Sequence, residues 1–352
     1  MEKKEKVIIG LAVAITIIAG ILHYVGVNEV IGFFVTAAAL ALLAVVVGDA
    51  TEQLGSRLGP GATGILQSGL GNLPELFVCI FALRAGLANV VQAALVGSIL
   101  GNSLLVFGMA LFLGGLKNGT QRFKSETPKM IATLMILAVA ALMIPTLAKE
   151  LHTPAEAHVD SLDIFCAIIL LVLLAASTIF SVKGDKAVSP NPEDCDQHPE
   201  WSLGLTIGVL AVAGVGAGFV SEWFVSALEP AMKALNITEA FAGLVVVAIA
   251  GNAIENIIGI QLAWRNQADY AVSVILNSSL QVALGLFPVL VLLSFVLGGS
   301  ILTLTLSPLL VVALALSTVV TAFVVYDGES IWLEGLALIG LYCIIAASFW
   351  WG

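Results

Sequence analysis

Eleven long apolar segments dominate this chain of 352 residues, and they limit its fold more than any other feature. A helix needs about 20 apolar residues to cross the hydrocarbon core of a bilayer. Hydrophobic residues make up 59% of the chain and charged residues only 11%, which excludes a soluble enzyme, a nucleic-acid-binding protein and a disordered chain. The sequence therefore predicts an all-α polytopic membrane protein with helices over residues 7–27, 30–53, 62–86, 90–114, 129–148, 162–182, 203–226, 239–265, 270–296, 300–325 and 331–351.

The Lys and Arg residues between these helices predict the orientation of the chain. Cytoplasmic loops of membrane proteins carry an excess of Lys and Arg. One side of the expected helices carries eleven of them, namely Lys3, Lys4, Lys6, Arg57, Lys117, Arg122, Lys124, Lys129, Lys183, Lys186 and Arg265. The other side carries three, namely Arg84, Lys149 and Lys233. We therefore expect a cytoplasmic N-terminus and an external C-terminus.

A polar, acidic stretch over residues 183–202 divides the expected helices into six and five. It predicts four parts: an N-terminal helix (1–28), a first group of helices (29–182), a cytoplasmic linker (183–202) and a second group (203–352). The linker is read either as a solvated tether or as a segment that attracts divalent cations. The four cysteines have no spacing typical of a disulfide framework or a zinc site; they are Cys79, Cys166, Cys195 and Cys343.

A short motif occurs twice, at the same relative position in each half. The sequence Gly71-Asn-Leu-Pro-Glu75 returns 180 residues later as Gly251-Asn-Ala-Ile-Glu255, and Ser98 matches Ser278 at the same offset. Five expected helices separate the two glutamates, so the two copies run in opposite directions through the bilayer. Inverted repeats of this kind are the plan of many secondary transporters. The expected repeats are helices 2–6 and 7–11, with helix 1 as an addition.

The two glutamates fall near the middle of their expected helices, where a carboxylate costs about 2.5–3.5 kcal/mol on insertion scales. No Lys, Arg or His lies at a comparable depth to pair with Glu75 or Glu255. Two facing carboxylates repel each other, and either a bound cation or protons relieve that repulsion. The alternative is that each glutamate is protonated and bonded to a backbone carbonyl, but the repeated motif favours a proton-coupled cation site.

The surrounding residues suit a hard cation such as Ca²⁺, which takes several oxygen ligands. Gly69, Gly71 and Pro74 are expected to loosen the helix before Glu75, and Gly251 to do so more mildly in the second copy, which frees backbone carbonyls. Further oxygens are expected from Asn72, Asn252, Ser98, Asn102, Ser278, Ser279 and Gln281. Glu52 and Glu222 either line the inner and outer approaches or are hydrated interfacial residues, whereas Asp49 is expected to be a hydrated interfacial residue.

Both motifs resemble the α-repeats of the calcium/cation antiporter superfamily, and within it the cation/proton exchanger (CAX) branch. The similar stretches are Gly71-Asn-Leu-Pro-Glu-Leu-Phe-Val with Val91–Asn102, and Gly251-Asn-Ala-Ile-Glu-Asn with Asn277–Leu284. The resemblance implies that Glu75 and Glu255 bind Ca²⁺ and H⁺. It also implies that Asn72 and Asn252, with backbone carbonyls near Gly71 and Gly251, complete the site. Auxiliary polar groups would come from Ser98, Asn102, Ser278 and Gln281. Glu52 and Glu222 would line the inner and outer passages.

The chain departs from the family pattern at a few positions. Asn277 stands where the family usually has Gly, and Pro74 makes the two halves less symmetric. The sodium-coupled branch typically has hydroxyl residues where this chain has Asn72 and Asn252, which favours protons as the coupling ion.

The expected function is export of cytosolic Ca²⁺ in exchange for H⁺ by alternating access. It implies Ca²⁺ and H⁺ as substrates, the lipid bilayer as the surroundings, no cofactor and no nucleic acid. We expect a prokaryotic plasma membrane protein, with homo-oligomer formation left open. The alternatives are a Na⁺/Ca²⁺ exchanger, a passive channel, and an intramembrane metal-dependent enzyme. The enzyme is disfavoured because no His pair or nucleophile motif lies in the spans.

Overall fold

The computed structural model describes residues 3–26, 28–58, 69–183 and 201–351. Most of the predicted 183–202 linker, with Cys195, lies outside these residues, as do the side chains of residues 253–255. The elements of the first half are α1 (Lys3–Val25), α2 (Glu29–Leu58), α4 (Leu73–Arg84), α5 (Ala88–Leu100), η1 (Gly101–Val106), α6 (Phe107–Asn118), β1 (Gln121–Arg122), α7 (Glu126–Glu150), η2 (Pro154–His158) and α8 (Val159–Lys183). Those of the second half are α9 (Leu203–Leu235), α10 (Glu239–Phe241), η3 (Ala242–Val247), α11 (Ala248–Gly251), α12 (Ala253–Trp264), α13 (Ala268–Gln281), η4 (Val282–Leu286), α14 (Phe287–Leu297), α15 (Pro308–Val324), β2 (Glu329–Ser330) and α16 (Trp332–Trp350).

Eight helices of the described chain are each long and apolar enough to cross a membrane. A further pair, Glu239–Gly251 and Asn256–Trp264, would cross as one span bent by 64°, and α15 is a shorter apolar helix. The prediction of all-α membrane-spanning architecture is confirmed. The predicted helix over 300–325 begins too early, because α15 starts at Pro308 and residues 300–307 before it are not helical.

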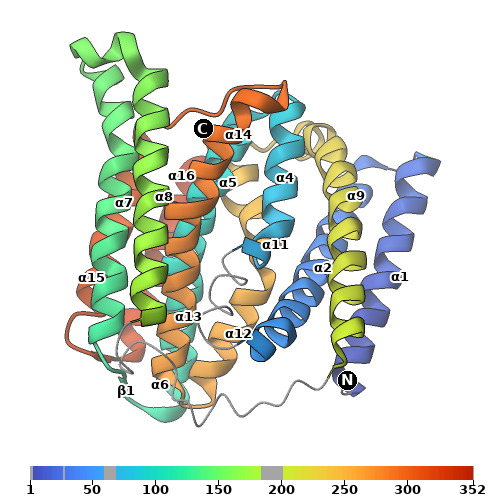
Figure 1. Cartoon of the computed structure of the whole chain (residues 1–352), viewed down its shortest axis with the longest axis horizontal. Coiled ribbons are helices and arrows are strands. Elements are labelled where there is room, and N and C mark those ends of the chain that lie inside the picture. Colours follow the sequence, from blue (N-terminus) through green and yellow to red (C-terminus); the bar gives the residue numbers. More distant parts are fainter. Residues whose placement is uncertain (1–2, 27, 59–68, 184–200, 352) are drawn as a thin grey trace.

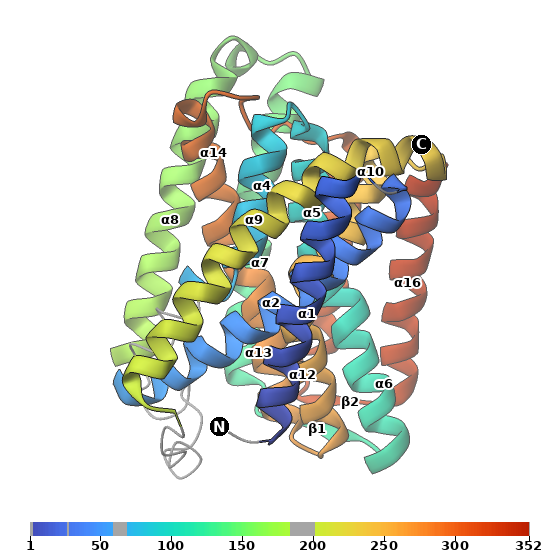
Figure 2. The same cartoon turned by 90° about the vertical axis from the view of Figure 1, so that its right-hand side faces the viewer.

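The helices form three groups (Figure 1). Helices α1, α2 and α9 lie together on one side, α7, α8 and α15 lie on the opposite side, and the helices that carry the repeated motifs lie between them. Figure 2 shows α2 and α9 running obliquely across the central helices. The two ends of the chain lie at opposite ends of the molecule (Figure 1).

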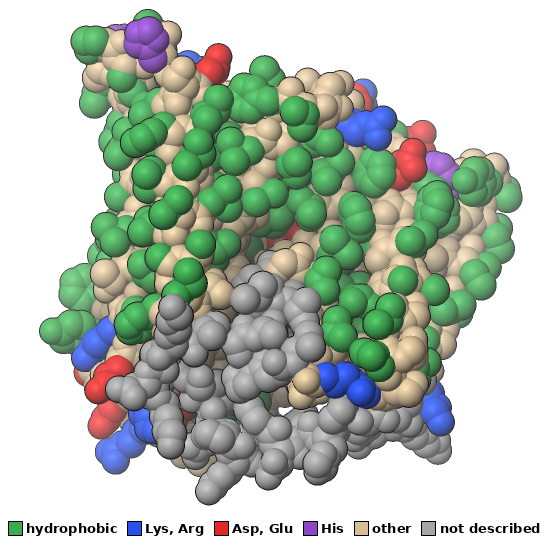
Figure 3. Space-filling view, in the orientation of Figure 1, with side chains coloured by type: hydrophobic (Ala, Val, Ile, Leu, Met, Phe, Trp, Pro, Cys, Tyr) green, Lys and Arg blue, Asp and Glu red, His purple; other side chains and the backbone are tan. Residues whose placement is uncertain are grey.

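On the face shown in Figure 3, the described side chains along the helices are largely apolar. Large apolar side chains such as Phe323 and Val296 are 75% and 77% exposed. Helices of this kind are stable when lipid covers their apolar faces and their backbone polar groups bond within the helix. The chain is therefore an integral membrane protein.

Small residues bring two central helices into very close contact. A Cβ atom placed on Gly97 of α5 would lie 2.2 Å from the carbonyl oxygen of Leu244 in η3. A Cβ atom on Gly243 of η3 would lie 2.4 Å from the carbonyl oxygen of Val90. Only glycine fits at such a crossing, which is how membrane helices commonly approach each other.

The elements around the two motifs start and end at equivalent positions. Both α4 and α12 have 12 residues, and each begins two residues after the Gly of its motif. Each copy continues into a helix interrupted by a π-helical segment, η1 in the first and η4 in the second. Such π-helical segments often occur at functional sites.

Candidate functional site

Both repeated motifs lie where a helix is interrupted. Gly71 and Asn72 form a turn, and α4 then begins at Leu73 with Pro74 in its first turn. In the second copy Asn252 lies between α11 and α12. The expected loosening before Glu75 is therefore present, but Pro74 lies within the first turn of the new helix and does not kink a continuous one. Proline suits that position because the first helical N–H groups have no partner within the helix.

This break places Glu75 in the first turn of α4, and residue 255 has the same position in α12. The N-terminus of a helix carries partial positive charge from the aligned peptide dipoles, which stabilises a negatively charged side chain nearby. Only the backbone of residue 255 belongs to the described structure, so the contacts of the Glu255 side chain stay a prediction.

The Glu75 side chain packs against the second motif. It is only 1% exposed. A Cβ atom placed on Gly251 would lie 3.3 Å from its Cβ, 3.4 Å from its Cγ and 3.6 Å from its Cδ. The first motif's carboxylate therefore lies directly beside the backbone of the second motif, and glycine at position 251 makes this approach possible.

Four polar side chains from both halves form a buried hydrogen-bonded network. Asn252 Nδ2 donates to Ser98 Oγ at 2.8 Å and to the Ala248 carbonyl at 2.9 Å. Asn102 Nδ2 donates to Ser278 Oγ at 3.0 Å and approaches Asn252 Oδ1 at 3.4 Å. All four side chains are at most 5% exposed. The structure therefore brings together Ser98, Asn102, Asn252 and Ser278, which the sequence named as one set.

A small cavity borders this network and adds a residue that the sequence analysis did not name. Its volume is about 10 Å³, close to the room that one water molecule needs. Its polar lining comes from Ser98, Asn102, Asn252 and Asn256. Asn256 Oδ1 is buried and has no hydrogen-bond partner among the described residues. The sequence signal for Asn256 was its place directly after Glu255. The equivalent residue of the first copy is Leu76, which has no polar group, so the comparison of the two copies did not single out Asn256.

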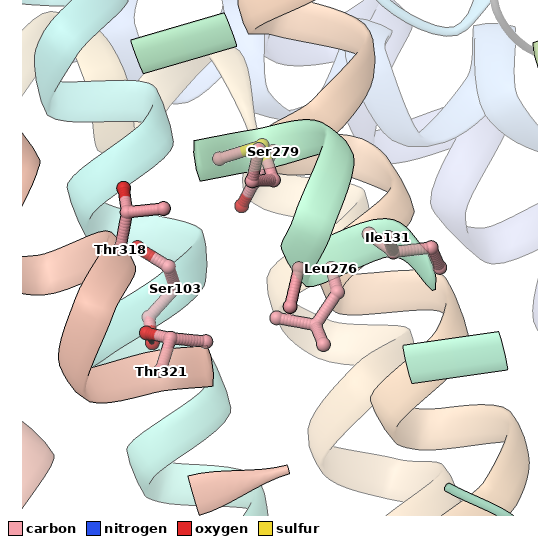
Figure 4. Close-up of a pocket in the computed structure, with 8 residues that line it drawn as sticks. Ser103, Ile131, Leu276, Ser279, Thr318 and Thr321 are labelled. Atoms are coloured by element: carbon pink, nitrogen blue, oxygen red, sulfur yellow. Dashed lines mark hydrogen bonds between the residues drawn. The ribbon is translucent and has the colours of Figure 1, made fainter. Parts of the chain in front are cut away.

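A second cavity of similar size lies between η1, α7, α13 and α15 and is lined by the hydroxyl residues Ser103, Ser279, Thr318 and Thr321. In Figure 4, Ser103, Thr318 and Thr321 lie along one wall, facing Leu276 and Ile131. Thr321 Oγ1 donates to the Ser103 carbonyl at 3.2 Å, and Ser103 Oγ donates to the Ile99 carbonyl at 2.6 Å. The Thr321 and Ser103 hydroxyl groups therefore donate hydrogen bonds to backbone carbonyls near the π-helical segment η1. Ser279, which the sequence named as a candidate ligand, lines this second cavity.

The remaining candidate residues lie around the central network. Asn72 directly precedes α4, makes no capping hydrogen bond with its side chain and is 7% exposed, whereas Gln281 is partly exposed at the end of α13. Glu52 of α2 and Glu222 of α9 are both exposed, and Asp49 is partly exposed. In Figure 3 the visible face is hollowed near its centre, and acidic atoms are visible inside the hollow.

Comparison with known proteins identifies the family. The family described as "Sodium/calcium exchanger protein" matches residues 28–183 and 205–351, which together are most of the chain. The chain belongs to the sodium/calcium exchanger protein family. The resemblance predicted from the two motifs is thereby confirmed.

Several relatives of this family member cover almost its whole length. A Ca²⁺/H⁺ antiporter from Synechocystis sp. is 34% identical over 347 residues, covering 93% of this chain and 92% of the relative. The Ca²⁺/H⁺ antiporter ChaA of Bacillus subtilis is 33% identical and covers 97% of each chain. The solved structure of native YfkE aligns with a TM-score of 0.83 and 30% identity, covering 99% of this chain and 100% of that one.

Proposed function

We propose that this protein is a secondary active transporter that exports cytosolic Ca²⁺ in exchange for H⁺. The observation that carries the proposal is the burial of Glu75 against Gly251, because it sets a carboxylate of the first motif beside the second motif. The relatives named Ca²⁺/H⁺ antiporters support the choice of ions. Ca²⁺ is the transported substrate here and not a resident cofactor.

The central site would consist of two carboxylates and a set of neutral oxygens. Glu75 and Glu255 would bind Ca²⁺ when ionised and protons when neutral, so the two substrates compete for the same atoms. Neutral ligands would come from Asn72, Asn252, Ser98, Asn102, Ser278 and Gln281, and from backbone carbonyls at Gly71 and Gly251. Ca²⁺ takes six to eight oxygens, so amide, hydroxyl and carbonyl groups have to complete the shell.

Access would alternate by movement of the α1, α2 and α9 group against the central helices. Glycines of α9 lie at its contact with α4: a Cβ atom added at Gly214 would lie 3.3 Å from the Leu73 side chain, and one added at Gly218 would lie 4.0 Å from the Phe77 ring. Small residues let membrane helices approach closely, and the absence of side chains at these two α9 positions supports sliding of α9 along α4. Glu52 and Glu222 belong to α2 and α9, so they would travel with this group and line the two approaches.

An inverted repeat would explain the matching of the two halves. The equal bounds of α4 and α12 relative to their motifs and the paired π-helical segments support it. Termini on opposite sides of the membrane are supported by their places at opposite ends of the molecule, and the distribution of Lys and Arg favours the cytoplasm for the N-terminus. That arrangement agrees with an odd number of spans.

The proposal is tested with Glu75→Gln and Glu255→Gln in inverted membrane vesicles. Each variant keeps the side-chain shape but can neither ionise nor exchange a proton. We expect each to abolish Ca²⁺ uptake driven by a proton gradient. Glu150→Gln is the matched control, because Glu150 is exposed at the end of α7, and it should transport normally. Uptake at the wild-type rate in either central variant would contradict the assigned site.

The coupling ion needs a separate measurement. Purified protein in liposomes is given either a proton gradient or, with a protonophore present, a sodium gradient. Ca²⁺ movement driven only by the proton gradient supports the proposal. Ca²⁺ movement driven by sodium would instead identify a Na⁺/Ca²⁺ exchanger with the same site.

A further inference from the structure

A buried aspartate outside the central site holds an extended segment of the chain. Residues 299–306, here called the outer segment, connect α14 to α15 at the upper end of the molecule in Figure 1. The backbone N–H of Leu304 donates to Asp163 Oδ2 of α8 at 3.1 Å. Asp163 is only 1% exposed. Its second oxygen, Oδ1, is buried and has no hydrogen-bond partner in the described part of the chain.

The outer segment has no helix of its own, so other helices bind its backbone groups. Thr146 Oγ1 of α7 donates to the Leu304 carbonyl at 3.1 Å and accepts the Leu306 N–H at 2.9 Å. Gln92 Nε2 of α5 donates to the Thr303 carbonyl at 2.8 Å. Asp163 is the ionisable side chain among these three partners, and the bond it accepts therefore depends on its charge.

The other end of the outer segment contacts the helix that carries Glu75. The N–H of Ser300 donates to the carbonyl of Leu83, in the last turn of α4, at 3.0 Å. Gly299 is so close that a Cβ atom there would lie 2.4 Å from the same carbonyl oxygen. The outer segment thus ties the end of α4 to α5, α7 and α8.

Among the described residues, no basic side chain pairs with Asp163. On its own helix the nearby ionisable groups are Asp160 and Cys166. Helix α14, η4 and the outer segment carry no ionisable residue. The ionisable residues at the adjoining ends of the other packed elements are exposed: Lys149 and Glu150 of α7, Glu156 and His158 of η2, and Arg84 of α4.

We propose that Asp163 is a proton-binding site separate from the central carboxylates, and that its ionised form fastens the outer segment to the bundle. A buried carboxylate with one hydrogen bond is costly, and a proton on its unpartnered oxygen neutralises it. A metal ion is the poorer fit, because Ca²⁺ takes six or more oxygens and the Thr146 hydroxyl already both donates and accepts. The step is simple addition of H⁺ from water to a carboxylate oxygen.

Proton binding weakens the contact between Asp163 and Leu304. A hydrogen bond to an ionised acceptor is roughly twice as strong as one to a neutral acceptor. Acidification therefore loosens the outer segment and, through Ser300, the end of α4. Under the proposed orientation this site faces the outside, so it would report external pH to the helix that carries Glu75.

Hydrogen–deuterium exchange of the purified full-length protein tests this without any transport measurement. After correction for the intrinsic pH dependence of exchange, protection of the Leu304 amide in the wild type should fall roughly five- to tenfold from neutral to acidic pH. In Asp163→Asn the amide oxygen still accepts the Leu304 N–H but does not titrate, so protection should be constant. Constant protection in the wild type, or the same pH dependence in Asp163→Asn, overturns the proposal.

Thr146→Val is the matched control, because it removes two hydrogen bonds to the outer segment without removing a titratable group. It should lower protection of the Leu306 amide at every pH and keep the pH dependence at Leu304. Loss of that dependence in Thr146→Val would overturn the assignment to Asp163. If Asp163→Asn fails to fold, the wild-type titration alone decides, because constant protection contradicts the proposal.

Discussion

At the scale of single residues, Gly251 decides how closely the two motifs approach. A Cβ atom at this position would lie 3.3 Å from Glu75 Cβ, closer than most such contacts. Gly251→Ala should therefore displace the Glu75 side chain at a cost of about 1 kcal/mol or more. We expect the apparent KM for Ca²⁺ to rise roughly fivefold or more, measured as Ca²⁺ uptake at several Ca²⁺ concentrations.

The control for this residue is Gly208→Ala in α9, where an added Cβ would meet nothing within 4 Å. It should leave the apparent KM unchanged. An unchanged KM in Gly251→Ala, with normal expression, would show that the contact between Gly251 and Glu75 does not shape the Ca²⁺ site.

Most residues of the candidate site could be named from the sequence, because the motif occurs twice. The offset of 180 residues singled out Glu75, Asn252 and the Ser98–Ser278 pair without any structure. Their partners could not be predicted, because a repeat says which residues are equivalent and not which ones touch. Asn256 was missed for a related reason: a site residue without an equivalent in the other copy is invisible to a comparison of the two halves.

At the scale of elements, the close crossing of α5 and η3 depends on glycine. A Cβ atom at Gly97 would lie 2.2 Å from a backbone oxygen of η3, and backbone cannot move aside as a side chain can. Gly97→Ala should therefore cost about 1–3 kcal/mol or more in stability. We expect a lower thermal unfolding temperature and a smaller yield of monodisperse protein in detergent.

Gly10→Ala in α1 is the matched test of helix propensity alone. An added Cβ at Gly10 meets no atom within 4 Å, so the substitution should be neutral or raise stability by up to about 1 kcal/mol. Equal stability of Gly97→Ala and Gly10→Ala would mean that α5 and η3 separate easily, contrary to the close packing.

Hydropathy predicted where helices lie but not where they break. The turn at Gly71–Asn72 and the π-helical segments change hydrogen-bond register within an apolar stretch, and hydropathy does not depend on that register. Hydropathy also does not distinguish an apolar helix from an apolar segment without helical structure, which explains why residues 300–307 were predicted as helix. Two local signals were present there: Leu302, Leu304 and Leu306 alternate with more exposed residues, and Ser307 caps the helix that begins at Pro308.

At the scale of the whole molecule, alternating access requires one group of helices to move against another. Two glycines of α9 allow the moving boundary to be tested. A Cβ atom added at Gly218 would lie 4.0 Å from the Phe77 ring of α4, and one added at Gly216 would lie 3.6 Å from the Leu43 side chain of α2. The first contact would cross the boundary between the groups, whereas the second would lie within the α1, α2 and α9 group.

Cysteine pairs at these contacts should therefore behave differently in a background without the native cysteines. A short thiol cross-linker that joins Phe77→Cys and Gly218→Cys fixes α9 to the central helices, so we expect Ca²⁺/H⁺ exchange in liposomes to stop and to return when a cleavable linker is reduced. The same treatment of Leu43→Cys and Gly216→Cys joins α2 to α9, which would move together under the proposed motion, so exchange should continue. Loss of exchange in both cross-linked pairs would mean that α2 and α9 also move against each other. Continued exchange in both pairs would exclude sliding at the α4–α9 contact as the transport motion.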